Sequence, residues 1–205
     1  MPQGQLAQPA PTDGLTTHQR RQLPTTVVFT GDGKGKSTAA FGMALRAWTA
    51  GIPLAVFQFV KSPPQWKVGE ESAFRELGAL HDDTGQGAPV DWNKLGSGWS
   101  WIRHHQDDDP AAAAAAGWAE IARRLSAEEY GFYLLDEFTY VLERGWVDSA
   151  EVIDTLQQRP GKQHVVITGR RAPAELIATA DLVTSMEKIK HPMDVGRRGQ
   201  KGIEW

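Results

Sequence analysis

The segment from Thr30 to Thr38, Thr-Gly-Asp-Gly-Lys-Gly-Lys-Ser-Thr, carries residue types that bind phosphate. Its alternate glycines let backbone N–H groups approach phosphate oxygens, and a helix that starts directly afterwards adds the positive end of its dipole. Lys36 supplies a mobile positive charge, and Ser37 supplies a hydroxyl for a magnesium ion. The segment therefore predicts a site for a nucleoside triphosphate with Mg²⁺, formed by Thr30, Gly31, Asp32, Gly33, Lys34, Gly35, Lys36, Ser37 and Thr38.

The spacing of this loop departs from the common phosphate-binding pattern, in which a glycine stands six positions before the lysine. Here that position is Thr30, so the loop is one residue shorter when it is counted from Gly31. A glycine-rich turn without a ligand is the alternative. A strand, the glycines, Lys-Ser and a helix follow one another in the order that phosphate binding needs, which favours the functional interpretation. We expect the triphosphate to lie differently from that of ordinary hydrolases.

Two carboxylates follow the apolar segment at residues 132–135, namely Asp136 and Glu137. In proteins with a phosphate-binding loop, an acid at the end of such a strand holds Mg²⁺, directly or through water. The alternative is the acidic start of a helix at Glu137. Together with the loop, the pair predicts Ser37, Asp136 and Glu137 as metal ligands. The residues alone leave open which acid contacts the ion directly.

The elements that would position these groups alternate along the chain. Apolar segments predict strands at 25–29, 54–60, 132–135, 163–168 and 182–186, and periodic segments predict helices at 36–50, 68–77, 111–125, 149–158 and 173–179. Gly51 and Gly78 are expected to end the first two helices, while Asp109 and Ser149 are expected to cap two others. Because the strands are apolar on both faces, we predict an α/β, P-loop NTPase-like fold whose parallel sheet is covered by helices on both faces. Ligands of such sheets bind at the carboxyl ends of the strands.

Composition narrows the class of protein. Residues 1–24 are rich in Pro, Gln and Thr and predict a flexible N-terminal arm, whereas residues 25–205 predict a single P-loop nucleotide-binding domain. The net charge of -3 opposes broad nucleic-acid binding or an anionic membrane surface. The absence of cysteine excludes disulfides, thiolate metal sites and a cysteine nucleophile. Without a signal peptide or a bilayer-spanning apolar run, we expect a cytoplasmic protein.

The stretch 81–108 predicts a long irregular loop that is too rich in tryptophan to be filler. Trp99 and Trp101 lie two residues apart, so an extended backbone would point both side chains the same way. They would then present two flat apolar surfaces to a ligand. Packing in the core is the alternative for both, and it is the interpretation that we give to Trp92.

The loop and its surroundings, residues 28–42, resemble the phosphate loop of the ATP:corrinoid adenosyltransferases that act on cob(I)yrinic acid a,c-diamide and cob(I)alamin. The resemblance runs from about residue 24 to the end, with Ser37 in place of threonine and Trp99 where phenylalanine can stand. Further matching segments are Gln58-Phe59-Val60-Lys61, Gly98-Trp99-Ser100-Trp101, Leu135-Asp136-Glu137-Phe138-Thr139-Tyr140, Arg159-Pro160-Gly161, Ile167-Thr168-Gly169-Arg170, Lys190-His191 and Lys201-Gly202-Ile203-Glu204.

The resemblance implies transfer of the 5′-deoxyadenosyl group of ATP to the Co(I) centre of a corrinoid, with release of triphosphate, in adenosylcobalamin (vitamin B12 coenzyme) biosynthesis. The cobalt is itself the nucleophile, which agrees with the absence of cysteine and of a convincing catalytic triad. The resemblance implies catalytic roles for Lys36, Glu137 and Trp101, and it favours Glu137 as the direct Mg²⁺ ligand. It also implies that the triphosphate runs through the loop in the reverse direction, which fits the shortened spacing.

Further expectations concern the substrates and partners. Trp99 and Trp101 would cover the corrinoid and keep water from the lower face of the cobalt. Arg170 would contact a phosphate, with a surface ion pair as the equal alternative. A flavoprotein reductase supplying Co(I) and a homodimer are also implied.

Two other classes of P-loop protein remain as alternatives. A kinase or ATPase acting by phosphoryl transfer would use the same loop and acidic pair. A GTPase is disfavoured because Asn93-Lys94-Leu95-Gly96 lacks the aspartate that would recognise guanine. The products separate these classes: adenosyl transfer releases triphosphate, whereas phosphoryl transfer releases a diphosphate.

Overall fold

The computed structural model describes residues 13–59, 69–95 and 109–203. None of the helices in these ranges is long and apolar enough to cross a bilayer. The elements in chain order are α1 (Thr17–Arg20), β1 (Thr26–Thr30), α2 (Lys36–Thr49), β2 (Leu54–Gln58), α3 (Gly69–Thr84), β3 (Val90–Lys94), α4 (Pro110–Ser126), β4 (Phe132–Asp136), α5 (Thr139–Glu143), α6 (Ser149–Gln158), β5 (His164–Thr168), α7 (Ala174–Thr179), β6 (Leu182–Ser185) and the 3₁₀ helix η1 (Pro192–Val195).

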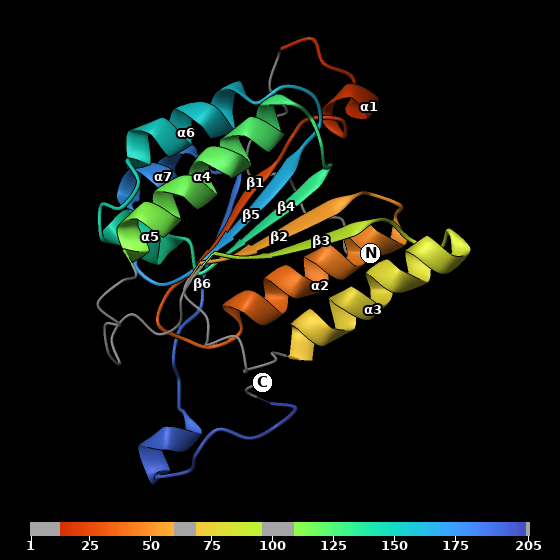
Figure 1. The fold of residues 1–205 in the computed structure, drawn as a ribbon. Helices are drawn as coiled ribbons and strands as arrows, with labels where there is room; N and C mark the ends of the chain where they lie inside the picture. The colour runs from red at the N-terminus through yellow and green to blue at the C-terminus, as the bar shows by residue number, and fades with distance from the viewer. Residues whose placement is uncertain (1–12, 60–68, 96–108, 204–205) are drawn as a thin grey trace.

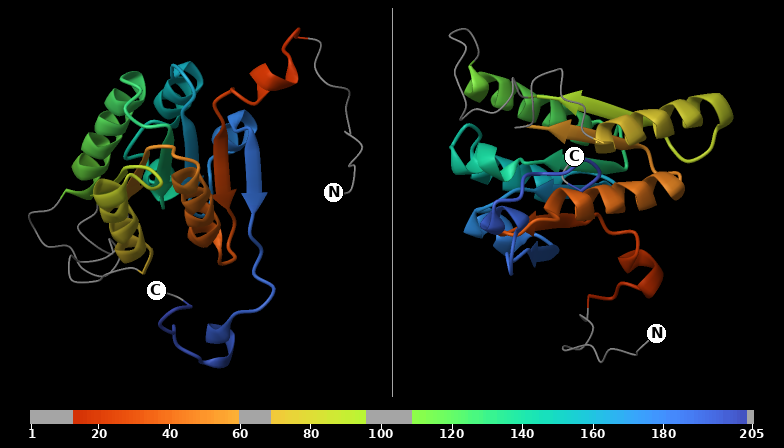
Figure 2. Two further views of the ribbon diagram at one scale, coloured as in Figure 1. Left: turned by 90° about the vertical axis from the view of Figure 1, so that its right-hand side faces the viewer. Right: turned by 90° about the horizontal axis from the view of Figure 1, so that it is seen from below.

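The strands form one parallel sheet in the order β3-β2-β4-β5-β1-β6. Helices α2 and α3 cover one face, and α4 to α7 cover the other (Figures 1 and 2). The predicted α/β architecture is therefore confirmed. Because β5 lies between β1 and β4, the loops that follow these three strands are neighbours at the carboxyl edge of the sheet.

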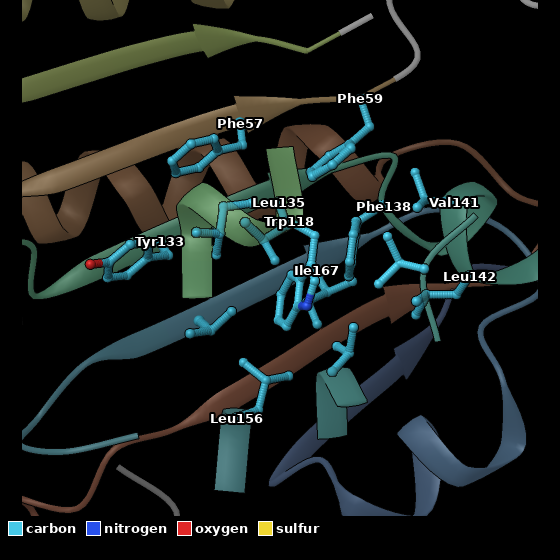
Figure 3. Close-up of a cluster of buried hydrophobic side chains, with 14 of the residues drawn as sticks. Phe57, Phe59, Trp118, Tyr133, Leu135, Phe138, Val141, Leu142, Leu156 and Ile167 are labelled. Carbon is cyan, nitrogen blue, oxygen red and sulfur yellow. The ribbon is translucent and has the colours of Figure 1, made fainter. Parts of the chain in front are cut away.

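Alternation along each strand divides the apolar side chains between two cores. On the face of α4 to α7, residues such as Phe57, Leu135 and Ile167 pack around Trp118 (Figure 3). On the face of α2 and α3, a second cluster contains Val56, Leu134 and Val166 with residues of both helices. The central strands β2, β4 and β5 are thus buried on both sides, as their continuous apolar sequences predict.

The prediction that Gly78 ends the second helix is wrong, because α3 continues through it to Thr84. A Cβ at position 78 would lie 3.3 Å from Cβ of Val90, so this glycine allows α3 to approach β3 closely. Its role is packing between elements rather than termination of a helix.

The stretch 81–108, predicted as irregular, contains the end of α3 and the edge strand β3. This strand was missed because only Trp92 of its five residues is buried, so its sequence lacks a continuous apolar run. The Trp92 ring stacks on Phe41 at 5.5 Å between ring centroids. The assignment of Trp92 to the core is therefore confirmed.

Smaller corrections concern helix starts. The cap of α6 is Asp148, whose side chain accepts a hydrogen bond from the backbone N–H of Ala150, and Ser149 is the first helical residue. The predicted cap Asp109 and the proline that follows it are confirmed for α4. The short helix α5 directly after the acidic pair was not predicted. Within the proposed arm, α1 forms one turn closed by Thr16 and Gln19.

Candidate nucleotide-binding site

The predicted phosphate loop connects β1 to α2 at the carboxyl edge of the sheet. Lys36, the first residue of α2, is buried, and its Nζ donates hydrogen bonds to the carbonyl oxygens of Gly31 at 2.8 Å and Gly33 at 2.6 Å. The ammonium group therefore lies across the mouth of the loop, held only by neutral carbonyls in these two bonds. It can exchange them for phosphate oxygens when an anion enters.

The glycines of the loop are needed for close packing as well as for access of a ligand. A Cβ at Gly31 would lie 2.5 Å from the carbonyl oxygen of Met186, and one at Gly33 would lie 2.6 Å from that of Glu187. The backbone N–H of Gly33 also donates to the Met186 carbonyl at 2.7 Å. The segment that follows β6 thus supports the loop, a contribution that the loop sequence did not indicate.

The end of β4 joins the loop through Asp136, which is fully buried. Its Oδ1 accepts hydrogen bonds from the hydroxyl of Ser37 at 2.7 Å and that of Thr168 at 2.8 Å. Its Oδ2 accepts from Nε2 of Gln58 at 3.2 Å. The predicted metal ligands Ser37 and Asp136 are therefore in direct contact, although they are far apart in the sequence.

Glu137 follows in an unusual backbone conformation, with φ of 61°. A non-glycine residue in this region is strained by about 1–3 kcal/mol, and such strain gathers at functional sites. Two contacts hold the turn: the Glu137 N–H donates to Thr168 Oγ1 at 2.9 Å, and the buried Phe138 ring packs between Phe59 and Trp118 (Figure 3). The fold therefore imposes the direction in which the Glu137 carboxylate leaves the chain.

Arg170 lies in the loop after β5. This loop is hydrogen-bonded to the turn that follows β4 at Asp136 and Glu137, which we call the acidic turn. Thr139 Oγ1 donates a hydrogen bond to the Arg170 carbonyl oxygen at 2.6 Å. Gly169 has φ of 138° and leaves no room for a side chain, because a Cβ there would lie 2.0 Å from Thr139 Oγ1. The Arg170 side chain is exposed. It is therefore available at the edge where the phosphate loop opens.

The electrostatics of the loop favour an anion. Burial lowers the pKa of Lys36 below the ordinary lysine value, and the charge of Arg170 lowers it further, while Glu137 and Asp32 act in the opposite direction. Burial and then Arg170 also lower the pKa of Lys34. Because three cations crowd one another at this loop, binding of a polyanion would relieve their repulsion.

The oxygen donors Ser37, Asp136 and Glu137 suit a hard cation such as Mg²⁺. Within the described ranges, no group of three or more His, Cys, Asp or Glu residues could hold a metal alone. A cation here would therefore take its remaining ligands from nucleotide phosphates and water, which is the usual way in which Mg²⁺ binds with ATP. The residues fit the predicted ion.

Comparison with known proteins gives the family of the chain. The sequence profile of the family "ATP:corrinoid adenosyltransferase BtuR/CobO/CobP" matches residues 22–205. The chain belongs to the ATP:corrinoid adenosyltransferase family. The corrinoid adenosyltransferase of Sinorhizobium sp is 41% identical over 180 residues, which cover 87% of this chain and 79% of that protein. The corresponding enzyme of Pseudomonas aeruginosa is 35% identical over 179 residues, covering 87% and 82%, and corrinoid adenosyltransferase CobA of Salmonella typhimurium is 35% identical, covering 87% and 84%.

Three of the motifs that suggested this adenosyltransferase family meet at the carboxyl edge of the sheet. The structure brings together the phosphate loop, the acidic pair and the Arg170 loop. Thr30 lies beneath them, where its hydroxyl accepts a hydrogen bond from the Ala172 N–H at 3.2 Å, and Thr38 is exposed on α2. Trp99 and Trp101, the predicted corrinoid-binding residues of this adenosyltransferase, lie outside the described residues.

Sequence reasoning missed the residues that position the site. Thr168 bridges the carboxylate of Asp136 and the backbone of Glu137, and Thr139 fixes the Arg170 loop. Both threonines are fully buried. Thr168 could have been found as a polar residue at the carboxyl end of an apolar strand. Thr139 could have been found only as part of the family motif.

Proposed function

We propose that this enzyme transfers the 5′-deoxyadenosyl group of ATP to the Co(I) centre of a corrinoid and releases triphosphate, as a step in adenosylcobalamin biosynthesis. The observation that carries the proposal is the contact of Ser37 with Asp136, which unites a phosphate loop and an acidic turn in a chain of this family. The corrinoid is cob(I)yrinic acid a,c-diamide or cob(I)alamin.

The proposed reaction needs no nucleophile from the protein. The electron pair of Co(I) attacks C5′ of the ribose and forms the cobalt–carbon bond. The C5′–oxygen bond breaks, and its electrons leave with the triphosphate. Negative charge grows on this leaving group, where Lys36, Lys34 and Arg170 stabilise it.

Ser37 and Glu137 would hold Mg²⁺ with the triphosphate, and Asp136 would orient the hydroxyl of Ser37 from below. When bound, the ion neutralises charge on the leaving group. The strained turn at Glu137 supports this role, because it fixes the carboxylate before the nucleotide arrives. Asp136 is buried and occupied by three side-chain donors, which favours Glu137 as the direct ligand.

Trp99 and Trp101 would cover the corrinoid, exclude water and keep the lower face of the cobalt without a ligand. Their sequence spacing and the glycines around them support this role. A one-electron reductant must supply Co(I), and we propose a flavoprotein. We also propose a cytoplasmic homodimer. The exposed apolar side chains of the C-terminal segment, Ile189, Met193, Val195 and Ile203, support an interface of that kind.

The test is anaerobic incubation of the enzyme with ATP, Mg²⁺ and chemically reduced corrinoid. We expect a light-sensitive alkylcobalt product and inorganic triphosphate in equal amounts. ADP and phosphate as the stoichiometric products, without an alkylcobalt species, would instead indicate phosphoryl transfer and reject the proposal.

A further inference from the structure

Gln58, the last residue of β2, belongs to a row of polar side chains that crosses the sheet beneath the nucleotide site. The register pairs it with Lys94 on one side and Asp136 on the other, and Thr168, the last residue of β5, donates its hydroxyl hydrogen bond to Asp136. Phe57, Phe59, Leu135 and Ile167 point to the opposite face. Gln58, Asp136 and Thr168 therefore project toward the face of α2, from which Ser37 reaches Asp136.

The orientation of the Gln58 carboxamide follows from its neighbour. Asp136 Oδ2 accepts the hydrogen bond at 3.2 Å, and an ionised carboxylate offers no proton in return, so Nε2 must face it. The carbonyl oxygen Oε1 is then turned away from that carboxylate oxygen. Gln58 is 1% exposed, and Oε1 has no hydrogen-bond partner among the described residues. A buried carbonyl without a partner costs about 1–3 kcal/mol.

Gln58 is also held rigidly against the acidic turn. Phe59, the next residue, donates its backbone N–H to the Asp136 carbonyl oxygen at 3.2 Å. Its ring packs on that of Phe138, with 4.7 Å between the ring centroids (Figure 3). On the β3 side of Gln58, Lys94 forms an ion pair with Glu71, with 2.5 Å between Nζ and Oε2. The strand ends that carry Gln58 and Glu137 are thus one packed unit.

We propose that Gln58 is a positioning residue for the hydrated cation that accompanies ATP. Its Nε2 fixes the rotamer of Asp136, and its Oε1 accepts a hydrogen bond from a water of that cation. The inference rests on the proposed function, because it assumes that the Ser37 and Glu137 site receives Mg²⁺ with the triphosphate.

Gln163 provides a matched control. It is also a buried glutamine, 2% exposed, and its Oε1 also lacks a partner among the described residues. It precedes β5, so it lies at the opposite edge of the sheet, where Nε2 donates to the backbone carbonyls of Leu125 and Pro160, each at 2.8 Å. Replacing either glutamine with methionine removes the same atoms, but only Gln58 adjoins the acidic turn.

The experiment measures Mn²⁺ affinity of the full chain with ATP by electron paramagnetic resonance, together with ATP affinity in the presence of a chelator and thermal unfolding. We expect Gln58→Met to weaken Mn²⁺ binding about tenfold, as loss of an outer-shell partner does, while metal-free ATP binding is retained. Gln163→Met should alter thermal stability only. Gln58→Glu keeps an acceptor oxygen but replaces the Nε2 donor with a second carboxylate against Asp136, so it should also weaken Mn²⁺ binding.

Ser37→Ala separates the proposed cation site from the role of Gln58. If it weakens Mn²⁺ binding while Gln58→Met and Gln58→Glu both match the parent, the inference about Gln58 is wrong and the proposed cation site stands. If Ser37→Ala also has no effect, the cation site itself is wrong, and the role of Gln58 fails with it. Equal losses in Gln58→Met and Gln163→Met would mean that both act through general stability, which also overturns the inference.

Discussion

The two edges of the same sheet use similar polar residues in different ways. At the carboxyl edge, Asp136 accepts hydrogen bonds from the side chains of Ser37, Thr168 and Gln58. At the amino edge, Asp181 accepts from the backbone N–H of Thr26 at 2.7 Å, and that N–H begins a strand. Bonds between side chains can be rearranged when a ligand enters, whereas a bond to the backbone holds an element in place. From this contrast we expect the carboxyl edge to serve binding and the amino edge to serve stability.

The matched substitutions Asp136→Asn and Asp181→Asn test this contrast most strongly. Asp136→Asn should reduce adenosyl transfer by about 100-fold in the folded protein, because an amide cannot accept from all three donors and the Ser37 hydroxyl loses its orientation. Asp181→Asn should retain nearly parental transfer but lose about 1 kcal/mol of unfolding free energy, because a neutral amide oxygen accepts the bond from Thr26 more weakly than a carboxylate does.

Urea unfolding and initial rates, both measured below the transition of either variant, separate the two effects. The contrast between the edges breaks down if Asp181→Asn loses as much activity per folded molecule as Asp136→Asn.

Two glycines with positive φ allow a second, smaller comparison. A Cβ at Gly169 would lie 2.0 Å from the buried Thr139 hydroxyl, whereas one at Gly161 would meet only the carboxylate of Glu128, an exposed and flexible side chain. Gly169→Ala should displace the Arg170 loop, weaken ATP binding about tenfold and destabilise the fold by about 1–3 kcal/mol. Gly161→Ala should cost about 1–2 kcal/mol of stability alone. Calorimetric titration with ATP checks both, and parental affinity of Gly169→Ala would show that the loop does not contribute to nucleotide binding.

The sequence predicted the parts of this molecule whose residues are specified locally. The phosphate loop follows from adjacent residues of β1 and α2, and the central strands follow from continuous apolar runs such as 132–135. The order of loop, acidic pair and Arg170 also placed these groups at one edge, since parallel strands present their carboxyl ends together.

What escaped prediction depends on contacts between distant segments. Strand β3 has a mostly polar sequence, and only Trp92 of its five residues is fully buried. Gly78 lies within α3 rather than at its end, because Val90 packs closely against it. The support of the phosphate loop by Met186 joins residues about 150 positions apart, and nothing in either segment alone specifies that contact. The same holds for the hydrogen bonds of Thr168 and Gln58 to Asp136.

The central claim is that the phosphate loop holds the triphosphate that leaves ATP, and inorganic triphosphate tests it directly. Because Lys36 lies across the loop and donates to the carbonyl oxygens of Gly31 and Gly33, we expect triphosphate to compete with ATP and to bind on the order of 100-fold more weakly to Lys36→Ala. Asp181→Asn should bind it as the parent does. The measurement is the inhibition constant of triphosphate against ATP at fixed Mg²⁺ and reduced corrinoid. Competitive inhibition lost in Lys36→Ala is the predicted result, and inhibition that is non-competitive, or unchanged in that variant, would contradict the account.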